Sequence, residues 1–316
     1  MILINWWLLN KDEILHLSET FIKIITKKIK TKSKNFNKFR IKIGLGREIY
    51  QSLVYRKQGI SVKALVKILQ ELDIPLKNAS KEIIAIGRYK CAQNLKFPIS
   101  VTPQWAELLA HAFFDGYADK YIMKYSNYDA NTRKEFVDLV RNIFDEKVRI
   151  NCPKSYLRDI NLPSIVPRLL TKFFNVQTFY SKKCRIPTQI FQLTKSDKKF
   201  GYYFLKGAFI DEGSITGGQI WIVRGIGNKF LADDIVKLCS ILGIKTRVQR
   251  SIKNKEYFSV GVCSESFERF YTNVRDLFFN KNYKLSKIET MMIKRSIPLT
   301  RGKDGRFERR PTWIAA

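Results

Sequence analysis

Two short apolar segments of similar sequence constrain this chain more than any other feature. The first runs from Leu108 to Gly116 (LLAHAFFDG) and the second from Leu205 to Gly213 (LKGAFIDEG). Each has a small residue in third place, and each ends in a carboxylate followed by glycine. A small residue on a helix face lets another backbone approach closely, and a glycine commonly follows a helix end in the left-handed conformation. The pattern predicts two matched helices that pack against each other.

The acids Asp115 and Glu212 fall in the last turn of the two predicted helices. The helix dipole favours cations there, so both carboxylates stand against the electrostatic preference. Two acids at matched helix ends indicate a shared cation. Hard oxygen ligands with few protein donors suit Mg²⁺, or Mn²⁺ in its place, with waters and phosphate oxygens as the remaining ligands.

The paired segments resemble the LAGLIDADG motif, and the chain resembles a two-motif, single-chain homing endonuclease of the DOD type, archaeal-like. The resemblance covers roughly residues 101–290. The small third residue, the eighth-position acid and the ninth-position glycine are all present. His111 and Lys206 depart from the family pattern. The two acids lie 97 residues apart, and similar sequence follows each.

The resemblance implies a magnesium-dependent nuclease that hydrolyses phosphodiester bonds in both strands of a long DNA site, as in intron homing. It implies that Asp115 and Glu212 are catalytic acids and metal ligands, with Gly116 and Gly213 beside them in the metal site. It also implies antiparallel strands lying in the major groove. A further basic residue near the acids is expected, with Lys245 or Lys253 as guesses. The basic residues expected to contact DNA from these strands are Lys124, Arg149, Arg224, Lys245, Arg247 and Arg250.

The charge of the chain points to a polyanionic partner. Lys and Arg number 58 against 28 Asp and Glu, a formal net charge of +30. Such an excess destabilises a compact state through self-repulsion unless a polyanion neutralises it, and nucleic acid is the leading candidate. Residues 1–100 alone carry 20 Lys and Arg against 7 Asp and Glu, so both parts of the chain should contact double-stranded DNA.

Other partners and compartments are less favoured. No apolar run is long enough to span a bilayer and no lipidation signal is present, so a membrane is not expected as partner. The five cysteines show no C-x-x-C pairing and the chain has two histidines, which disfavours structural zinc and fits buried free thiols in a reducing compartment. We expect a cytoplasmic, nucleoid-associated monomer without an obligate protein partner.

The first hundred residues carry a second pattern. Residues 11–32 show apolar spacing typical of a helix. Residues 36–74 read as a short helix, a turn at Gly44–Gly46, a second short helix, and a longer helix capped by Ser61. This order resembles a helix-turn-helix of the phage-repressor type, and a generic three-helix module is the alternative. The recognition helix would run from Arg47 to Lys57 and present Arg47, Gln51, Arg56 and Lys57 to bases and phosphates.

The expected fold class is α+β, with two pseudo-symmetric αββαββα repeats preceded by a small all-α helix-turn-helix domain. The expected boundaries are a helical domain at 1–80, with the helix-turn-helix at about 36–74, a linker at 81–100, an endonuclease domain at 101–290 with repeats at about 101–195 and 196–282, and a basic tail at 291–316. Within the second region, a helix is expected from about Ala130 to Phe144, and Thr188–Leu193 could be a strand or a short helix.

Three functions remain open at this point. The first is a DNA endonuclease, the second a non-cleaving DNA-binding transcription regulator on the same scaffold, and the third an RNA-splicing maturase. Retention of both acids favours cleavage, and the helix-turn-helix pattern favours DNA over RNA. His111 is expected to be a packed side chain. The register set by the glycine selects Glu212 over Asp211 as the functional acid.

Overall fold

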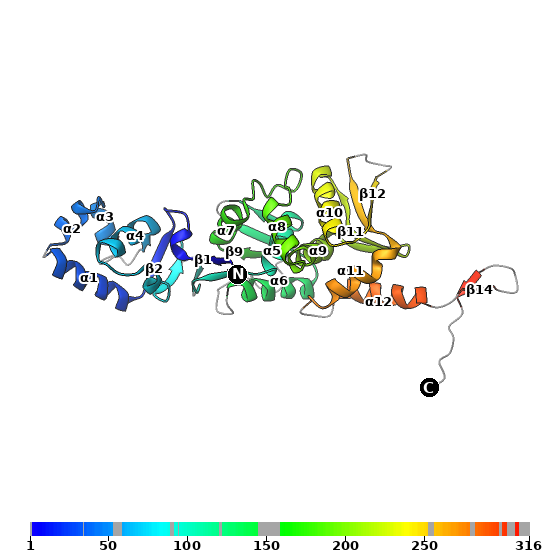
Figure 1. Ribbon diagram of the computed structural model, residues 1–316, viewed down its shortest axis with the longest axis horizontal. Coiled ribbons are helices and arrows are strands. Elements are labelled where there is room, and N and C mark those ends of the chain that lie inside the picture. Colours follow the sequence, from blue (N-terminus) through cyan, green and yellow to red (C-terminus); the bar gives the residue numbers. More distant parts are fainter. Residues whose placement is uncertain are drawn as a thin grey trace, which may run out of the picture.

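The protein is an elongated α+β molecule in which the N-terminal part, the duplicated part and a C-terminal helix follow one another (Figure 1). This α+β class agrees with the class predicted from the sequence. The structure, a computed structural model, describes residues 2–33, 35–52, 59–88, 92–93, 95–119, 122–144, 159–251, 256–278, 282–296, 299–301 and 307–309.

The N-terminal part combines helices with a four-stranded antiparallel sheet of order β3-β2-β4-β5. Its helices are α1 (Glu19–Ser33), α2 (Phe36–Lys42), α3 (Arg47–Tyr50) and α4 (Val62–Glu71). Its strands are β2 (Ile14–Leu17), β3 (Ile60–Ser61), β4 (Ile83–Ile86) and β5 (Ala92–Gln93). The expectation of an all-α domain is therefore wrong. The stretch predicted as a linker contributes β4 and β5 to this sheet, and β6 (Ile99–Val101) pairs with β1 (Ile2–Ile4).

The helix predicted for residues 11–32 begins later than expected. Strand β2 occupies residues 14–17 and lies between β3 and β4, where most of its side chains are buried. Ser18 separates strand from helix, because its Oγ accepts a hydrogen bond from the Phe21 amide at 3.1 Å. A short apolar run has no periodicity that distinguishes a buried strand from a helix, which accounts for the difference.

The helical segments predicted for residues 36–74 are present. Gly44 adopts a φ of +64° after α2, which breaks the first helix. Ser61 caps α4 by accepting a hydrogen bond from the Ala64 amide at 3.3 Å. The described part of the expected recognition helix is α3 with the exposed Arg47, followed by the half-buried Gln51. Arg56 and Lys57 lie outside the described residues.

The region after residue 101 contains two series of elements in corresponding order, with one exception. The first half has α5 (Gln104–Phe113), the hairpin β7 (Gly116–Ala118) and β8 (Met123–Ser126), α6 (Ala130–Phe144), β9 (Asp159–Leu162) and α7 (Ile165–Phe174). The second has α9 (Lys199–Glu212), β10 (Ser214–Thr216), β11 (Gln219–Ile226), α10 (Lys229–Ile241), β12 (Thr246–Arg250), β13 (Phe258–Val262) and α11 (Phe267–Arg275). Strand β12 of the second half has no counterpart among the described residues of the first.

The two sheets are equivalent in topology. Their orders are β7-β8-β9 and β10-β11-β13-β12, so β9 pairs with β8 as β13 pairs with β11. Arg149, expected to contact DNA, lies outside the described residues. The open assignment at Thr188–Leu193 is settled as the helix α8 (Thr188–Ser196), with Ile190 fully buried.

The last described helix extends into the stretch assigned above to a basic tail at 291–316. Helix α12 spans Tyr283–Ser296, and β14 (Leu299–Arg301) pairs with β15 (Phe307–Arg309). Ile288 is fully buried and Leu285 nearly so, because α12 packs on α11 and β10. Within the described part of the chain, no helix has the length and apolar character needed to cross a bilayer.

Candidate functional site

Helices α5 and α9 pack tightly against each other, as the two apolar segments predict. The contact depends on the small residues in third place. A Cβ atom added at Gly207 would lie 2.8 Å from the Ala110 Cβ and 3.0 Å from the Glu107 carbonyl oxygen. Real Cβ atoms essentially never approach other atoms that closely, so this pair of positions sets the distance between the two helices.

The glycines after the acids have a different role from the one expected. Gly213 has φ −74° and ψ 154°, and Gly116 is not among the glycines with positive φ. Neither adopts the left-handed conformation that the sequence argument assumed. A Cβ at Gly116 would lie 2.5 Å from the His111 carbonyl oxygen, and one at Gly213 would overlap the Phe209 backbone. Glycine is required because the chain folds directly back over the last helical turn.

Asp115 and Glu212 leave these two helix ends as half-buried carboxylates. The Asp115 Oδ2 atom accepts a hydrogen bond from the side-chain Nδ2 of Asn127 at 2.9 Å. Burial, together with the negative charges of Asp211 and Glu212, nevertheless raises the pKa of Asp115 to about 7. Burial and Asp211 also raise the pKa of Glu212. The acids therefore share one electrostatic environment, in which ionisation of each opposes ionisation of the next.

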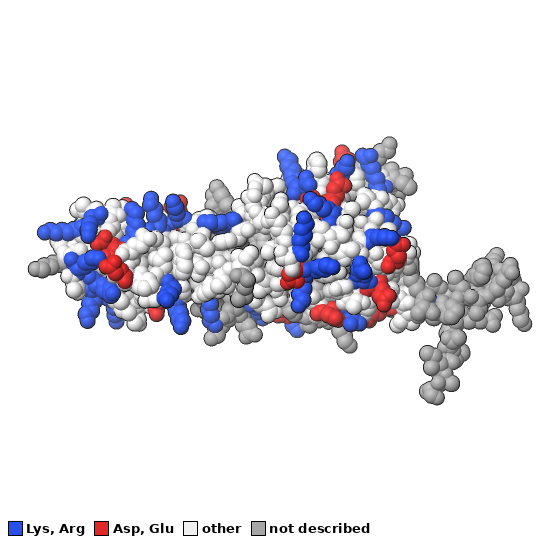
Figure 2. Space-filling model, viewed as in Figure 1, with Lys and Arg blue, Asp and Glu red and all other residues white. Residues whose placement is uncertain are grey.

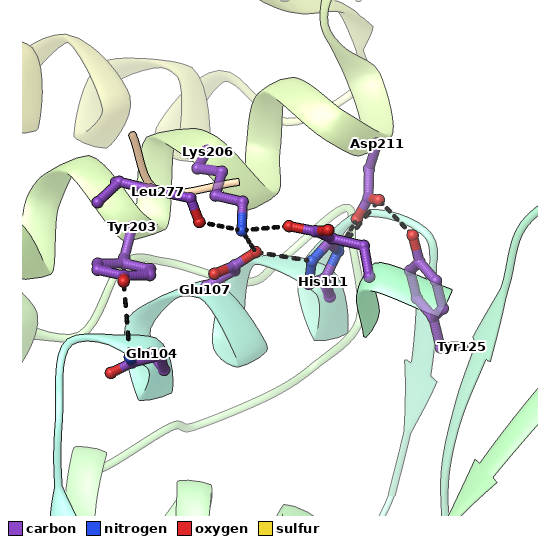
Figure 3. A network of polar contacts seen from close by, with 9 residues as sticks. Gln104, Glu107, His111, Tyr125, Tyr203, Lys206, Asp211 and Leu277 are labelled. Carbon is purple, nitrogen blue, oxygen red and sulfur yellow. Dashed lines mark hydrogen bonds and ion pairs between the residues drawn. The ribbon is translucent and has the colours of Figure 1, made fainter. Parts of the chain in front are cut away.

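Asp211 belongs to a buried polar contact that the sequence argument missed. Its carboxylate accepts hydrogen bonds from the Tyr125 hydroxyl at 2.8 Å and the His111 Nδ1 at 2.9 Å (Figure 3). Burial acts to lower the pKa of His111, but Asp211 and Glu107 outweigh it and raise the pKa to about 9. His111 is thus packed, as expected, but as an imidazolium that balances the charge of Asp211.

The buried charges continue along the interface of α5 and α9. Lys206, fully buried, donates to the Glu135 Oε1 at 2.8 Å and to the Leu277 carbonyl at 3.0 Å. Its Nζ also lies 2.7 Å from the Glu107 Oε1, with which it forms an ion pair. The His111 Nε2 is 3.7 Å from the same oxygen. Charges of alternating sign therefore run from Lys206 through Glu107 and His111 to Asp211 (Figure 3).

The donor set fits a cation that takes few protein ligands. Among the residues that the structure describes, no three His, Cys, Asp or Glu side chains form a group that could hold a metal. Asp115 and Glu212 offer carboxylate oxygens only, which suits Mg²⁺ or Mn²⁺ with waters and phosphate oxygens completing the shell. Glu212 also lines a cavity of about 240 Å³, whose other walls include Phe114, Lys182 and Tyr257. Ligand and water therefore have room beside this acid.

Of the two positions guessed for a basic residue near the acids, only Lys245 lies among the described residues. The Lys245 side chain is largely exposed and pairs with Glu265 at 2.8 Å, and Lys253 lies outside the described residues. Lys284 of α12 instead lies within the electrostatic reach of Asp115, Asp211 and Glu212. Nothing in the motifs pointed to this lysine.

The expected DNA contacts are distributed over the surface. Arg224, Arg247 and Arg250 are exposed on β11 and β12, and the Arg247 guanidinium lies 4.8 Å from the centre of the Trp221 ring. Lys124 on β8 is partly neutralised by Asp159 at 2.5 Å. Lysine and arginine side chains gather over the N-terminal part and again over the C-terminal half on the face shown in Figure 2.

Comparison with known proteins finds structural likeness at low identity. No protein-family model and no curated protein matches the chain. A mesophilic variant of the homing endonuclease I-DmoI matches with 16% identity and a TM-score of 0.42, over 56% of this chain and 98% of that one. I-DmoI in complex with DNA and Mn matches with 16% identity and a TM-score of 0.41, over 54% and 96%. Full-length DUF199/WhiA from Thermatoga maritima matches with 13% identity and a TM-score of 0.39, over 62% and 61%. These values leave the family of the chain open.

Proposed function

We propose that the chain is a divalent-metal-dependent DNA endonuclease that hydrolyses phosphodiester bonds in both strands of a duplex site. One observation carries the proposal. Asp115 and Glu212 leave equivalent ends of two tightly packed helices, in a duplicated unit, and burial and like charge raise the pKa of Asp115 to about 7. Carboxylates held together against repulsion at a partly open site are suited to binding a shared cation.

The residues around the acids supply the supporting roles. The Asn127 side chain orients Asp115 by a hydrogen bond, while His111 and Tyr125 do the same for Asp211. Gly116 and Gly213 let the chain fold back over the last turn of each helix. When bound, Mg²⁺ or Mn²⁺ would activate a water molecule and stabilise the leaving oxygen of a phosphodiester. The pseudo-twofold relation of the acids suits the two antiparallel strands of a DNA duplex.

The surface supports a nucleic-acid substrate. A net charge of +30 provides for phosphate neutralisation. The strands β11 and β12 present Arg224, Arg247 and Arg250, and α3 begins with the exposed Arg47. We propose that the arginines of β11 and β12 contact the DNA phosphate backbone and position the protein on the duplex. Arg47 and Gln51 would contribute to recognition of the DNA sequence.

Cleavage of a randomised duplex library with and without Mg²⁺ tests the proposal. Asp115→Asn and Glu212→Gln should each lower Mg²⁺-dependent cleavage by at least about 100-fold while leaving DNA affinity largely intact. Asp233→Asn, which removes an exposed acid on α10, is the matched control and should cut like the wild type. Undiminished cutting by either Asp115→Asn or Glu212→Gln would contradict the proposal. DNA binding without any cutting by the wild type in Mg²⁺ or Mn²⁺ would favour a non-cleaving regulator.

A further inference from the structure

Helix α12 brings a buried lysine to the end of α9. Lys284 is 7% exposed. Its Nζ donates hydrogen bonds to the Phe209 carbonyl at 2.9 Å and the Ile210 carbonyl at 2.6 Å. These carbonyls belong to the last turn of α9, from which Glu212 projects. The negative end of a helix favours a cation at this place.

The position of Lys284 within its own helix runs against the usual preference. The Asn282 side chain accepts a hydrogen bond from the Lys284 amide at 2.9 Å, which places the lysine in the first turn of α12. A cation is disfavoured at a helix N-terminus, and removing an ammonium group from water is costly. Its location is therefore explained by the partners it meets on α9, and not by α12.

The charges of three acids act on this lysine. Burial lowers the pKa of Lys284, while Asp211, Asp115 and Glu212 act in the opposite direction. Lys284 in turn counteracts the rise in the pKa of Glu212. A lysine ammonium has three donors, of which two are used by the α9 carbonyls. The two bonds fix the ammonium group at the last turn of α9, and no direct bond to Asp115 or Glu212 is among the described contacts.

We propose that Lys284 is a positioning residue of the acid site, which fixes the last turn of α9 and thereby the direction of Glu212. Helix α12 then contributes a residue to the acid site from a distant part of the sequence. This inference rests on the proposed endonuclease function for its catalytic consequence, but the structural role of Lys284 can be measured separately.

The first experiment measures amide hydrogen exchange of peptides covering residues 206–213 in the full-length protein. Lys284→Met should exchange at least about tenfold faster there than the wild type, because the turn loses its hydrogen bonds to a charged donor. Lys287→Met removes an exposed lysine from the same helix and should leave the exchange unchanged. Equal exchange in wild type and Lys284→Met would overturn the proposal, whether or not the protein cuts DNA.

The second experiment measures single-turnover DNA cleavage. Misplacement of a reacting group by about 1 Å costs on the order of 100-fold in rate, so Lys284→Met should lose about that factor with unchanged DNA affinity. Lys284→Arg, which keeps the cation, should recover at least tenfold of it, and Lys287→Met should cut like the wild type. A cleavage rate of Lys284→Met equal to the wild type would overturn the role. A wild type that does not cut would contradict the endonuclease function, and the exchange experiment would still decide the role of Lys284.

Discussion

The proton affinity of Asp115 follows from the place its side chain occupies. A carboxylate with an amide donor, such as Asn127, would ordinarily titrate in the acid range. Here burial, Asp211 and Glu212 raise the pKa to about 7. The acid is therefore partly protonated near neutral pH in the metal-free protein, and a bound divalent cation should displace that proton.

Asp115→Asn should change the pH dependence of stability. Because the pKa is about 7 in the folded chain and 3.8 in its unperturbed state, the folded chain holds the extra proton between these values. Stability contributed by this proton is complete below the lower value and is lost as the pH rises through about 7. We expect Asp115→Asn to stabilise the metal-free protein by about 1–2 kcal/mol at pH 8, after allowance for partial exposure. Urea denaturation at pH 5 and pH 8 measures this; a gain of equal size at both values contradicts it.

Removal of His111 should leave Asp211 as an uncompensated buried charge. His111→Leu should lower the free energy of unfolding by about 3–5 kcal/mol, as for other broken buried ion pairs. The pKa of His111 is raised from 6.5 to about 9, so the lost contribution is fully present below pH 6.5 and declines as the pH rises through 9. The effect should thus be largest near pH 6.

A paired variant is the control for that measurement. His111→Leu combined with Asp211→Leu removes both charges, and such replacements are often close to neutral. The double variant should recover most of the stability lost by the single one in thermal or urea unfolding. If the two variants were equally destabilised, ion pairing would not explain the role of His111.

At the scale of single residues, the sequence predicts the candidate acids but not their neighbours. Asp115 and Glu212 are predicted because a repeated local pattern places each beside glycine. Lys284 lies 72 residues after Glu212, so no local pattern connects them. A signal did exist: Lys284 shares a helical face with the buried Ile288 and Met291. A lysine within an apolar stripe is a candidate for a buried partner.

At the scale of elements, the contact between α5 and α9 leaves no room for an added side-chain atom at Gly207. In an isolated helix, Gly→Ala is stabilising by roughly 0.5–1 kcal/mol. At Gly207 the new Cβ would lie 2.8 Å from the Ala110 Cβ, so we expect Gly207→Ala to be destabilising by about 1–3 kcal/mol through overpacking. Thermal unfolding measures the sign. Gly227→Ala, which meets ordinary contact distances and a negative φ, should change stability by about 0.5 kcal/mol or less.

Elements were predicted well where one periodicity extended over several turns. Helix α6 was expected from Ala130 to Phe144 and spans those residues. The sequence predicts helix at β2, because the four residues of this strand are too few to show a period and their burial depends on pairing with β4, about 70 residues away. Partners at that distance in the sequence leave no trace in a local pattern.

For the molecule as a whole, duplication and charge give different kinds of evidence. The duplicated order of elements was readable because both copies kept the acid, the glycine and the spacing between them. The N-terminal sheet was not readable, since its strands come from four separated segments. Net charge is a property of the entire chain and determines how it associates with polyanions, not how it folds.

DNA affinity should fall steeply with salt. If the chain makes about 6–10 phosphate contacts, the association constant should drop by roughly 10³–10⁵ between 50 and 200 mM salt. Arg247→Ala on β12 should reduce the salt slope by about one. Lys245→Ala, on the chain beside it, should have a smaller effect because Glu265 already pairs with this lysine. Fluorescence anisotropy over a salt series measures both slopes, and a salt-independent affinity contradicts phosphate neutralisation.

The most direct measurement is the anomalous scattering of Mn²⁺ in crystals of the full chain bound to a DNA duplex. If Asp115 and Glu212 bind a shared cation, a peak should lie within ligand distance of carboxylate oxygens from both residues, and crystals of Glu212→Gln should show no such peak. A manganese ion bound elsewhere, or the two carboxylates turned away from each other with no ion between them, would contradict a shared metal site.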